Sequence, residues 1–417
     1  MKNFRFGLVA AFGAVIATAA FGEVIDREQG IKIGQRMTLL PYVSLSVTYD
    51  SNVEAQNGST GAEEGDVLWT IAPGLGLTYN AENWSLLLSG YYNFRSYTKD
   101  CYRNYNAHNY GQDLRWNWSN AAGGEKGWAI IIGESFRQYT MADDMTLDGG
   151  QNYSGDSRQL QLSGVVQRRF SDKWHADVNA DYYWLDYMND KQSRYTYYGW
   201  DRWSVGAEAG FAPSKWTDFL VSGSYMGYTQ DNLEGSRYDG SSNGFSVQAG
   251  LGSYMTERIS YRVMGGWSQF RYSDFDEPAN GFVYTASGNW KIGETWNTMF
   301  LASSYYQPSE RQYSTQTRVD AISWGVAKLL LRGKLRANFD LRYRHEDNEY
   351  LGVANRNGDY ALDIITARLG ASYYINRIFS VFGNIEYQRS FNDKDPNPTG
   401  TYDYDRWRAT VGVKLSY

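Results

Sequence analysis

The sequence predicts an all-β protein, a transmembrane antiparallel β-barrel of about 18 strands. The first observation is a repeated alternation of apolar and polar residues in long segments. The second is composition, since 36 Tyr, 15 Trp and 43 Gly accompany only 7 Pro in 417 residues. The third is a mean hydropathy of −0.57 without an apolar run of roughly 20 residues past the N-terminus, which excludes a helical membrane protein. Strands with one apolar and one polar face satisfy all three observations.

The chain opens with a segment typical of a secretory signal peptide, residues 1–22. Lys2 and Arg5 form a positive start, an apolar stretch follows, and Ala20-Phe21-Gly22 supplies small residues before a cleavage point at Glu23. Removing two cations and no anions moves the formal net charge from −6 to −8. We therefore expect export to the outer membrane of a Gram-negative bacterium. Residues 23–36 would be a short periplasmic segment, and residues 37–417 the barrel.

The strands follow from strict period-two alternation, in which successive side chains point to opposite faces. The last segment shows this most clearly. From Trp407 to Tyr417 every odd-numbered residue is apolar or aromatic, and the residues between them are polar or small. Similar alternation marks residues 42–49 and 335–344. Such segments are longer than the roughly 5–6 residues usual in a soluble protein. Aromatic residues that bracket the apolar stripes have the positions expected of membrane-interface girdles: Trp84, Trp174, Trp216, Trp290 and Tyr373.

Connection lengths predict strand number and orientation. Eight short turns alternate with nine long polar loops, which gives 18 strands and places both termini in the periplasm, because outer-membrane barrels have short periplasmic turns. Residues 281–331 are the least regular, so 16 strands is the alternative. The short turns fall near 80–82, 119–126, 170–173, 213–215, 255–258, 291–295, 332–334 and 375–377.

The final residue, Tyr417, is an aromatic at the lipid-facing parity of the last strand. The last strand must pair with the first, because an open strand edge in hydrocarbon leaves backbone groups without hydrogen bonds. We therefore interpret Tyr417 as a barrel-assembly signal, with the barrel assembly machinery as a partner. Outer-membrane lipid and lipopolysaccharide are the other expected partners. A homo-oligomer is compatible with the sequence, and nucleic-acid binding is not expected.

Residues 38–52, which read TLLPYVSLSVTYDSN, resemble the opening strand of the putative beta-barrel porin 2 family. In that family a Pro precedes the alternation, and the strand ends in a Tyr-Asp-x-Asn element. The resemblance then continues across the chain as long aromatic strands with wide loops. It implies an outer-membrane location and a barrel fold more firmly than any substrate. Relatives linked to exopolysaccharide systems leave a secretion role open, and no catalytic residues are implied.

Residues that would carry chemistry are few. Cys101 is the only cysteine, so an intrachain disulfide framework and a cysteine-based metal site are excluded. The three histidines, His108, His175 and His345, are predicted at opposite ends of the barrel, which disfavours a metal site or a catalytic group. We expect no enzyme activity, no cofactor and no metal. Between the predicted cleavage point and the first strand lie only the 14 residues 23–36, too few for the plug domain of an energised transporter.

The side chains predicted to face the lumen are the candidate functional residues. Rings of cations in a pore favour anions, and an 18-strand lumen is wide enough for water. The alternative is that these charges pair across strands and only satisfy a wet interior. The charged candidates are Arg115, Arg336, Arg342, Arg344, Arg368, Arg406, Arg408, Asp340 and Glu386. The sequence thus favours a passive pore for small hydrophilic solutes. The alternatives are a surface-polymer secretion component and a surface-exposed binding or structural barrel.

Overall fold

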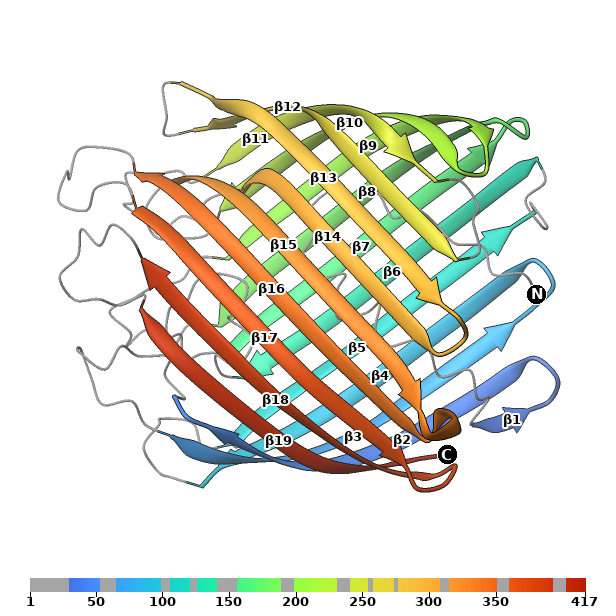
Figure 1. Cartoon of the computed structure of the whole chain (residues 1–417), viewed down its shortest axis with the longest axis vertical. Helices are drawn as coiled ribbons and strands as arrows, with labels where there is room; N and C mark the ends of the chain where they lie inside the picture. The colour runs from blue at the N-terminus through green and yellow to red at the C-terminus, as the bar shows by residue number, and fades with distance from the viewer. Residues whose placement is uncertain are drawn as a thin grey trace.

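The computed structural model shows a closed antiparallel barrel of 18 long strands, with one additional short strand (Figure 1). It describes residues 30–52, 65–98, 106–120, 126–140, 156–188, 199–230, 241–253, 258–273, 277–307, 315–350, 360–392 and 403–417. The predicted signal peptide, Cys101 and most of each long connection lie outside these residues. The predicted fold class and the count of 18 are confirmed, and the irregular stretch at 281–331 contains most of one strand and the whole of two others.

The strands of the barrel are mostly 14 or 15 residues long. At about 3.3 Å per residue and a tilt near 45°, such a strand rises about 33 Å, which is the thickness of a bilayer core. Their bounds are β2 Met37–Asp50, β3 Asp66–Asn80, β4 Trp84–Tyr97, β5 Asn106–Ser119, β6 Gly127–Thr140, β7 Asp156–Arg169, β8 Trp174–Met188, β9 Trp200–Ser214, β10 Thr217–Gln230, β11 Ser242–Gly252, β12 Ile259–Tyr272, β13 Ala279–Ile292, β14 Trp296–Gln307, β15 Thr315–Leu330, β16 Leu335–Tyr350, β17 Tyr360–Tyr374, β18 Phe379–Asn392 and β19 Tyr404–Ser416.

Each long strand pairs with its sequence neighbours, and β19 pairs with β2 to close the ring. The closing register runs from Arg408 opposite Asp50 to Ser416 opposite Tyr42. Beyond it, the backbone N–H of Tyr417 donates to the carbonyl of Pro41 at 3.1 Å. Closure removes the strand edges that would otherwise leave backbone groups without partners in the bilayer.

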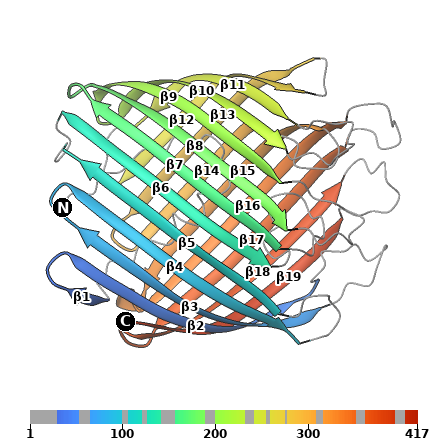
Figure 2. The same ribbon diagram turned by 180° about the vertical axis from the view of Figure 1, so that it is seen from behind.

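The strands connect at two different ends, visible from both sides of the barrel (Figures 1 and 2). At the turn end, neighbouring strands are joined by a few residues, such as 293–295 and 375–378. Gly293 at the first of these turns has φ +65°, which glycine adopts without a steric cost. The short 3-10 helix Leu331–Gly333 (η3) forms another turn. The strand ends that flank the long connections lie at the opposite end, called the loop end below.

The additional strand β1, Ile31–Ile33, pairs with the start of β2 at the turn end. It lies within the segment 23–36, for which the sequence predicted only a short periplasmic stretch. Among the described residues, none of the helices is long and apolar enough to cross a bilayer.

Most of the large apolar side chains point outward, and most of the charged side chains point into the lumen. On β19 the odd-numbered residues are exposed on the outer surface, with Val411 at 66% and Trp407 at 51%. The residues between them face inward and are largely covered. The predicted girdle residues Trp84, Trp174, Trp216, Trp290 and Tyr373 are all exposed on the outside. Soluble β-proteins have the opposite arrangement, and this reversal is what surrounding lipid and a water-filled interior require.

Candidate functional site

The predicted lumen residues fall on the inner face of the barrel, because each is opposite in parity to exposed apolar neighbours. On β16, for example, Arg342 lies between the outward Leu341 and Tyr343. On β5, Arg115 is inward, and its Nε donates to the Asn117 side chain at 3.2 Å. The inner faces of β16, β17, β18 and β19 carry the other eight candidates: Arg336, Asp340, Arg342, Arg344, Arg368, Glu386, Arg406 and Arg408.

Strand register brings five charges of alternating sign into one row. Asp340 is opposite Arg368, Arg368 is opposite Glu386, and Glu386 is opposite Arg408. Arg408 in turn is opposite Asp50 on β2. Directly opposed residues on one sheet face have side chains close enough to interact, and opposite charges there are favourable. The row therefore crosses five adjacent strands without two like charges in neighbouring positions.

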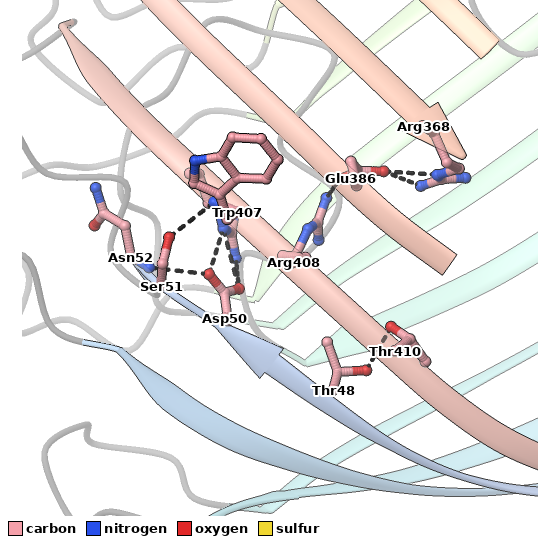
Figure 3. A network of polar contacts seen from close by, with 10 residues as sticks. Thr48, Asp50, Ser51, Asn52, Arg368, Glu386, Trp407, Arg408 and Thr410 are labelled. Carbon is pink, nitrogen blue, oxygen red and sulfur yellow. Dashed lines mark hydrogen bonds and ion pairs between the residues drawn. The ribbon is translucent and has the colours of Figure 1, made fainter. Parts of the chain in front are cut away.

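Glu386 bonds to two arginines in this row (Figure 3). The Nε of Arg368 donates to Glu386 Oε2 at 2.7 Å, and Nη2 of Arg408 forms an ion pair with Oε1 of the same carboxylate. The Glu386 side chain is only 4% exposed, whereas that of Arg368 is 44% exposed. A buried carboxylate requires such partners, because transfer of an unpaired charge from water is very costly. Arg368 meanwhile remains in contact with the aqueous lumen.

The seam between the first and last strands contains a second ion pair. The Nε of Arg406 donates to Asp50 Oδ1 at 2.9 Å and to Oδ2 at 3.0 Å, and its Nη2 also contacts Asp50. Both side chains are buried, at 7% and 3% exposure. On the same seam Thr48 and Thr410 hydroxyls lie 2.9 Å apart (Figure 3). These polar contacts reinforce the backbone ladder that closes the barrel.

The Tyr-Asp-x-Asn element of the sequence forms part of this seam. Asp50 accepts from Arg406, and the hydroxyl of Ser51 accepts from the backbone N–H of Trp407 at 2.8 Å (Figure 3). Asn52 is fully buried, and its Nδ2 donates to the carbonyl of Asp405 at 3.1 Å. The element that suggested a family resemblance thus joins the first strand to the last.

The strands β16 to β19 together with β2 form what we call the cationic wall. Among the described residues, its inner face carries seven basic and four acidic side chains. Arg344 Nε pairs with Glu346 at 2.6 Å, and the Lys414 ammonium lies 4.5 Å from the centre of the Tyr42 ring. The seven are Arg336, Arg342, Arg344, Arg368, Arg406, Arg408 and Lys414, and the four are Asp50, Asp340, Glu346 and Glu386.

The strands β8 to β12 form the acidic wall. Among the described residues, its inner face carries the acids Asp177, Asp181, Glu208 and Asp218 and the bases Arg202 and Arg262, together with His175. Asp177 is directly opposite Glu208. Nη1 of Arg262 donates to Glu208 Oε1 at 2.8 Å, reaching it across two intervening strands. His175 Nε2 lies 2.9 Å from Asp218 Oδ2.

Sequence reasoning named Glu386 among the lumen charges but missed two other acidic partners of its predicted arginines. Asp50 was read only as part of a motif, and Glu346 was assigned no role. Alternation alone could have placed both on the inner face, because each continues the inward parity of its strand. The pairing of Asp50 with Arg406 needs the strand register, which alternation does not supply, whereas Glu346 lies two residues from Arg344 on the same strand. Within the described residues, no group of three His, Cys, Asp or Glu side chains has the arrangement of a metal site.

Comparison with known protein families supplies an independent observation. Residues 227–417 match the family described as Putative beta-barrel porin 2. The resemblance predicted from the sequence is confirmed over this range, which covers the last four residues of β10 and all later strands. The motif at residues 38–52 lies outside it. Together with the closed barrel and its apolar outer surface, the match identifies the protein as an outer-membrane β-barrel.

Solved structures with a similar arrangement are outer-membrane proteins of low sequence identity. The siderophore receptor PirA from Pseudomonas aeruginosa is 8% identical, covering 93% of this chain and 81% of that chain, with a TM-score of 0.43. The outer membrane protein opdK from the same organism is 11% identical over 91% of this chain and 99% of its own, with a TM-score of 0.44. The FrpB iron transporter from Neisseria meningitidis is 9% identical, covering 92% and 82%, with a TM-score of 0.45. No curated protein sequence matches.

Proposed function

We propose that the protein is a passive pore for small hydrophilic solutes, oriented with its turn end in the periplasm. One observation carries the proposal: inward-facing charged side chains reach solvent inside the barrel. The Arg137 and Asp113 side chains, paired at 3.2 Å, are 36% and 40% exposed, and Arg368 is 44% exposed. A lumen packed as an apolar core would exclude water from such groups. The membership of residues 227–417 in a porin-like family supports the same function.

The pore works without bond-making chemistry. Solutes are selected by lumen width and by the charges of the wall, since side-chain charges beside the path of an ion tune selectivity. Pairing within the cationic wall reduces its effect on passing ions, because Glu386 neutralises much of the field of Arg368 and Arg408. The inner face of that wall still has a basic excess. We therefore propose a weak preference for anions, in spite of the negative net charge of the whole chain.

Conductance of the refolded protein in a planar lipid bilayer tests the proposal. We expect stepwise current increments that scale with bulk salt conductivity, and a reversal potential under a salt gradient that indicates anion preference. A correctly folded barrel that never conducts would contradict the pore. That result would favour the roles in surface-polymer secretion or surface binding. A polymer-secretion role predicts instead that a polysaccharide chain of several sugar units binds to the purified barrel.

A further inference from the structure

The outer surface of most of the barrel has a continuous apolar band. On β17 the outward residues from Tyr373 are apolar until Asp363, ten positions along the strand. On β18 they are apolar or aromatic from Phe379 until Arg389, again ten positions away. Ten residues of a tilted strand span about 25 Å, which is the height of the apolar band of an outer-membrane barrel. The outward charges at the loop end of these strands therefore lie at the level of lipid headgroups.

Strands β5 and β6 interrupt this band near its middle. Gln112 and Glu134 are each only six positions from an outward tryptophan at the turn end, Trp118 and Trp128 respectively. Gln112 Nε2 donates to Glu134 Oε1 at 3.0 Å. The strand partners of Glu134 are Leu114 on one side and Leu162 on the other. Leu162 is 42% exposed on the outer surface.

The opposite face of the same two strands confirms that this pair points outward. Arg137 and Asp113, at the other parity, form the solvent-exposed pair in the lumen described above. Glu134 is the one acidic or basic side chain that lies near the middle of the outer band in the part of the chain that the structure describes. Its position therefore needs an explanation that the rest of the outer surface does not need.

Further polar side chains continue from this pair toward the loop end. Tyr110 Oη donates to Gln138 Oε1 at 2.6 Å, and Arg158 Nε reaches the same oxygen at 3.3 Å. We call Tyr110, Gln112, Glu134, Gln138 and Arg158 the polar patch of β5–β7. Arg158 lies close to the loop end of β7, where lipopolysaccharide headgroups can pair with it. No headgroup reaches the depth of Gln112 and Glu134.

Hydrocarbon is a poor environment for Gln112 and Glu134. The Gln amide has two N–H donors and one acceptor, and the Glu carboxyl has two oxygens, so their one mutual bond leaves most of this capacity unused. Polar groups within a membrane are therefore expected to face protein instead of lipid, and to bond to partners there. Gln and other polar side chains form hydrogen bonds between membrane-spanning elements for this reason.

We propose that the polar patch of β5–β7 is an interface with a second copy of this chain. The patch is self-complementary, because Gln112 offers donors and Glu134 offers acceptors at the same depth. A symmetry axis along the membrane normal brings identical depths together, so the Gln112 amide of one copy meets the Glu134 carboxyl of the next. The apolar side chains around them, such as Ile132 at 46% exposure, pack against the partner. This interface does not depend on the proposed pore activity.

Disulfide cross-linking in membranes tests the position of the interface. In a Cys101→Ser background, Ile132→Cys should give a dimer of two copies on oxidation. Ile322→Cys is the matched control, since Ile322 has 45% exposure on β15, nine strands from β6 in the ring. It should remain monomeric. No cross-link at residue 132, equal cross-linking at both positions, or an adduct with a protein of another mass would overturn the proposal.

Substitution of the polar pair tests its contribution. The double variant Gln112→Leu, Glu134→Leu makes the outer face more apolar, so the barrel still inserts and folds. Its oligomer should dissociate at a detergent-to-protein ratio about tenfold lower than for the wild type, as expected for the loss of one or two membrane hydrogen bonds. Gln269→Leu, an outward polar residue on β12, is the control and should not change the oligomer. Light scattering of the detergent-solubilised protein gives the mass. A monomeric wild type, or an unchanged oligomer in the double variant, would contradict the interface.

Discussion

The cationic wall and the acidic wall face each other across the lumen, because β17 and β8 are nine strands apart in a ring of 18. They differ in how their charges are held. On the cationic wall, Glu386 sits between two arginines and Asp50 is buried beside Arg406. On the acidic wall, Arg262 contacts Glu208, while one oxygen of buried Asp177 has no hydrogen-bond partner. One wall thus has an excess of positive charge, and the other an excess of negative charge.

This difference indicates that the net charge of the whole chain is a poor guide to the ion selectivity of the proposed pore. Fields fade over about 8 Å at physiological ionic strength, so a passing ion responds mainly to the nearer wall. In the proposed pore, the opposite walls would provide separate regions for anions and cations. Ion selectivity then depends on the difference between two opposing contributions, and each can be changed by substitution. The walls also differ in construction, since only the cationic wall contains the seam between the first and last strands.

The largest expected effect comes from removing part of that seam. Deleting residues 411–417 eliminates six of the nine residue pairs between β19 and β2 and leaves backbone groups of both strands without partners at several kcal/mol each, roughly. We expect no folded barrel, measured as loss of the heat-modifiable band in electrophoresis. Tyr417→Phe keeps the terminal aromatic and should fold normally. A heat-modifiable barrel from the deletion variant would show that the seam is dispensable.

The next effect is on stability, from Glu386→Gln. This change leaves Arg368 and Arg408 without their shared carboxylate, and breaking a buried ion pair in this way costs about 3 kcal/mol. Urea unfolding, followed by tryptophan fluorescence, measures the free energy of unfolding. The same variant should move the reversal potential toward anions, because a negative charge is lost from the cationic wall. An unaltered unfolding curve would mean that the arginines find other partners.

Arg262→Gln is the matching change on the acidic wall, and its effect on selectivity should have the opposite sign. Glu208 then loses its bidentate partner and lies directly opposite Asp177. We expect the reversal potential to shift toward cations. If both Glu386→Gln and Arg262→Gln moved the reversal potential in the same direction, the opposing-wall account would be wrong.

The smallest effect should come from the single change Arg342→Gln, compared with a triple variant that includes it. Replacing Arg342, Arg344 and Arg408 together by Gln should shift the reversal potential toward cations, since three positive charges leave the lumen. The single change Arg342→Gln should produce only a fraction of this shift, because the carboxylate of Asp340 two residues away already offsets part of its field. Reversal potentials of both variants in the same salt gradient measure the ratio. No shift in the triple variant would place all three arginines away from the ion path.

The sequence predicted the barrel, its strand number and the inward side of the charged residues, because all three follow from period-two alternation and connection length. Arg368 and Glu386 were correctly placed on the same face for this reason. That they touch depends on register, which is set by turn geometry and by all the pairings before it. The contact between Asp50 and Arg406 joins residues 356 positions apart, so no local pattern reveals it. Glu134 was missed because it interrupts an otherwise regular apolar stripe.

The buried pair of Arg406 and Asp50 has a consequence for how the ring is completed during biogenesis. A slip of one residue between β19 and β2 would turn Arg406 and Arg408 toward hydrocarbon. A slip of two residues would keep the faces but carry Arg406 away from Asp50. The pair therefore favours the correct register when β19 joins β2, because only that register brings the two opposite charges into contact.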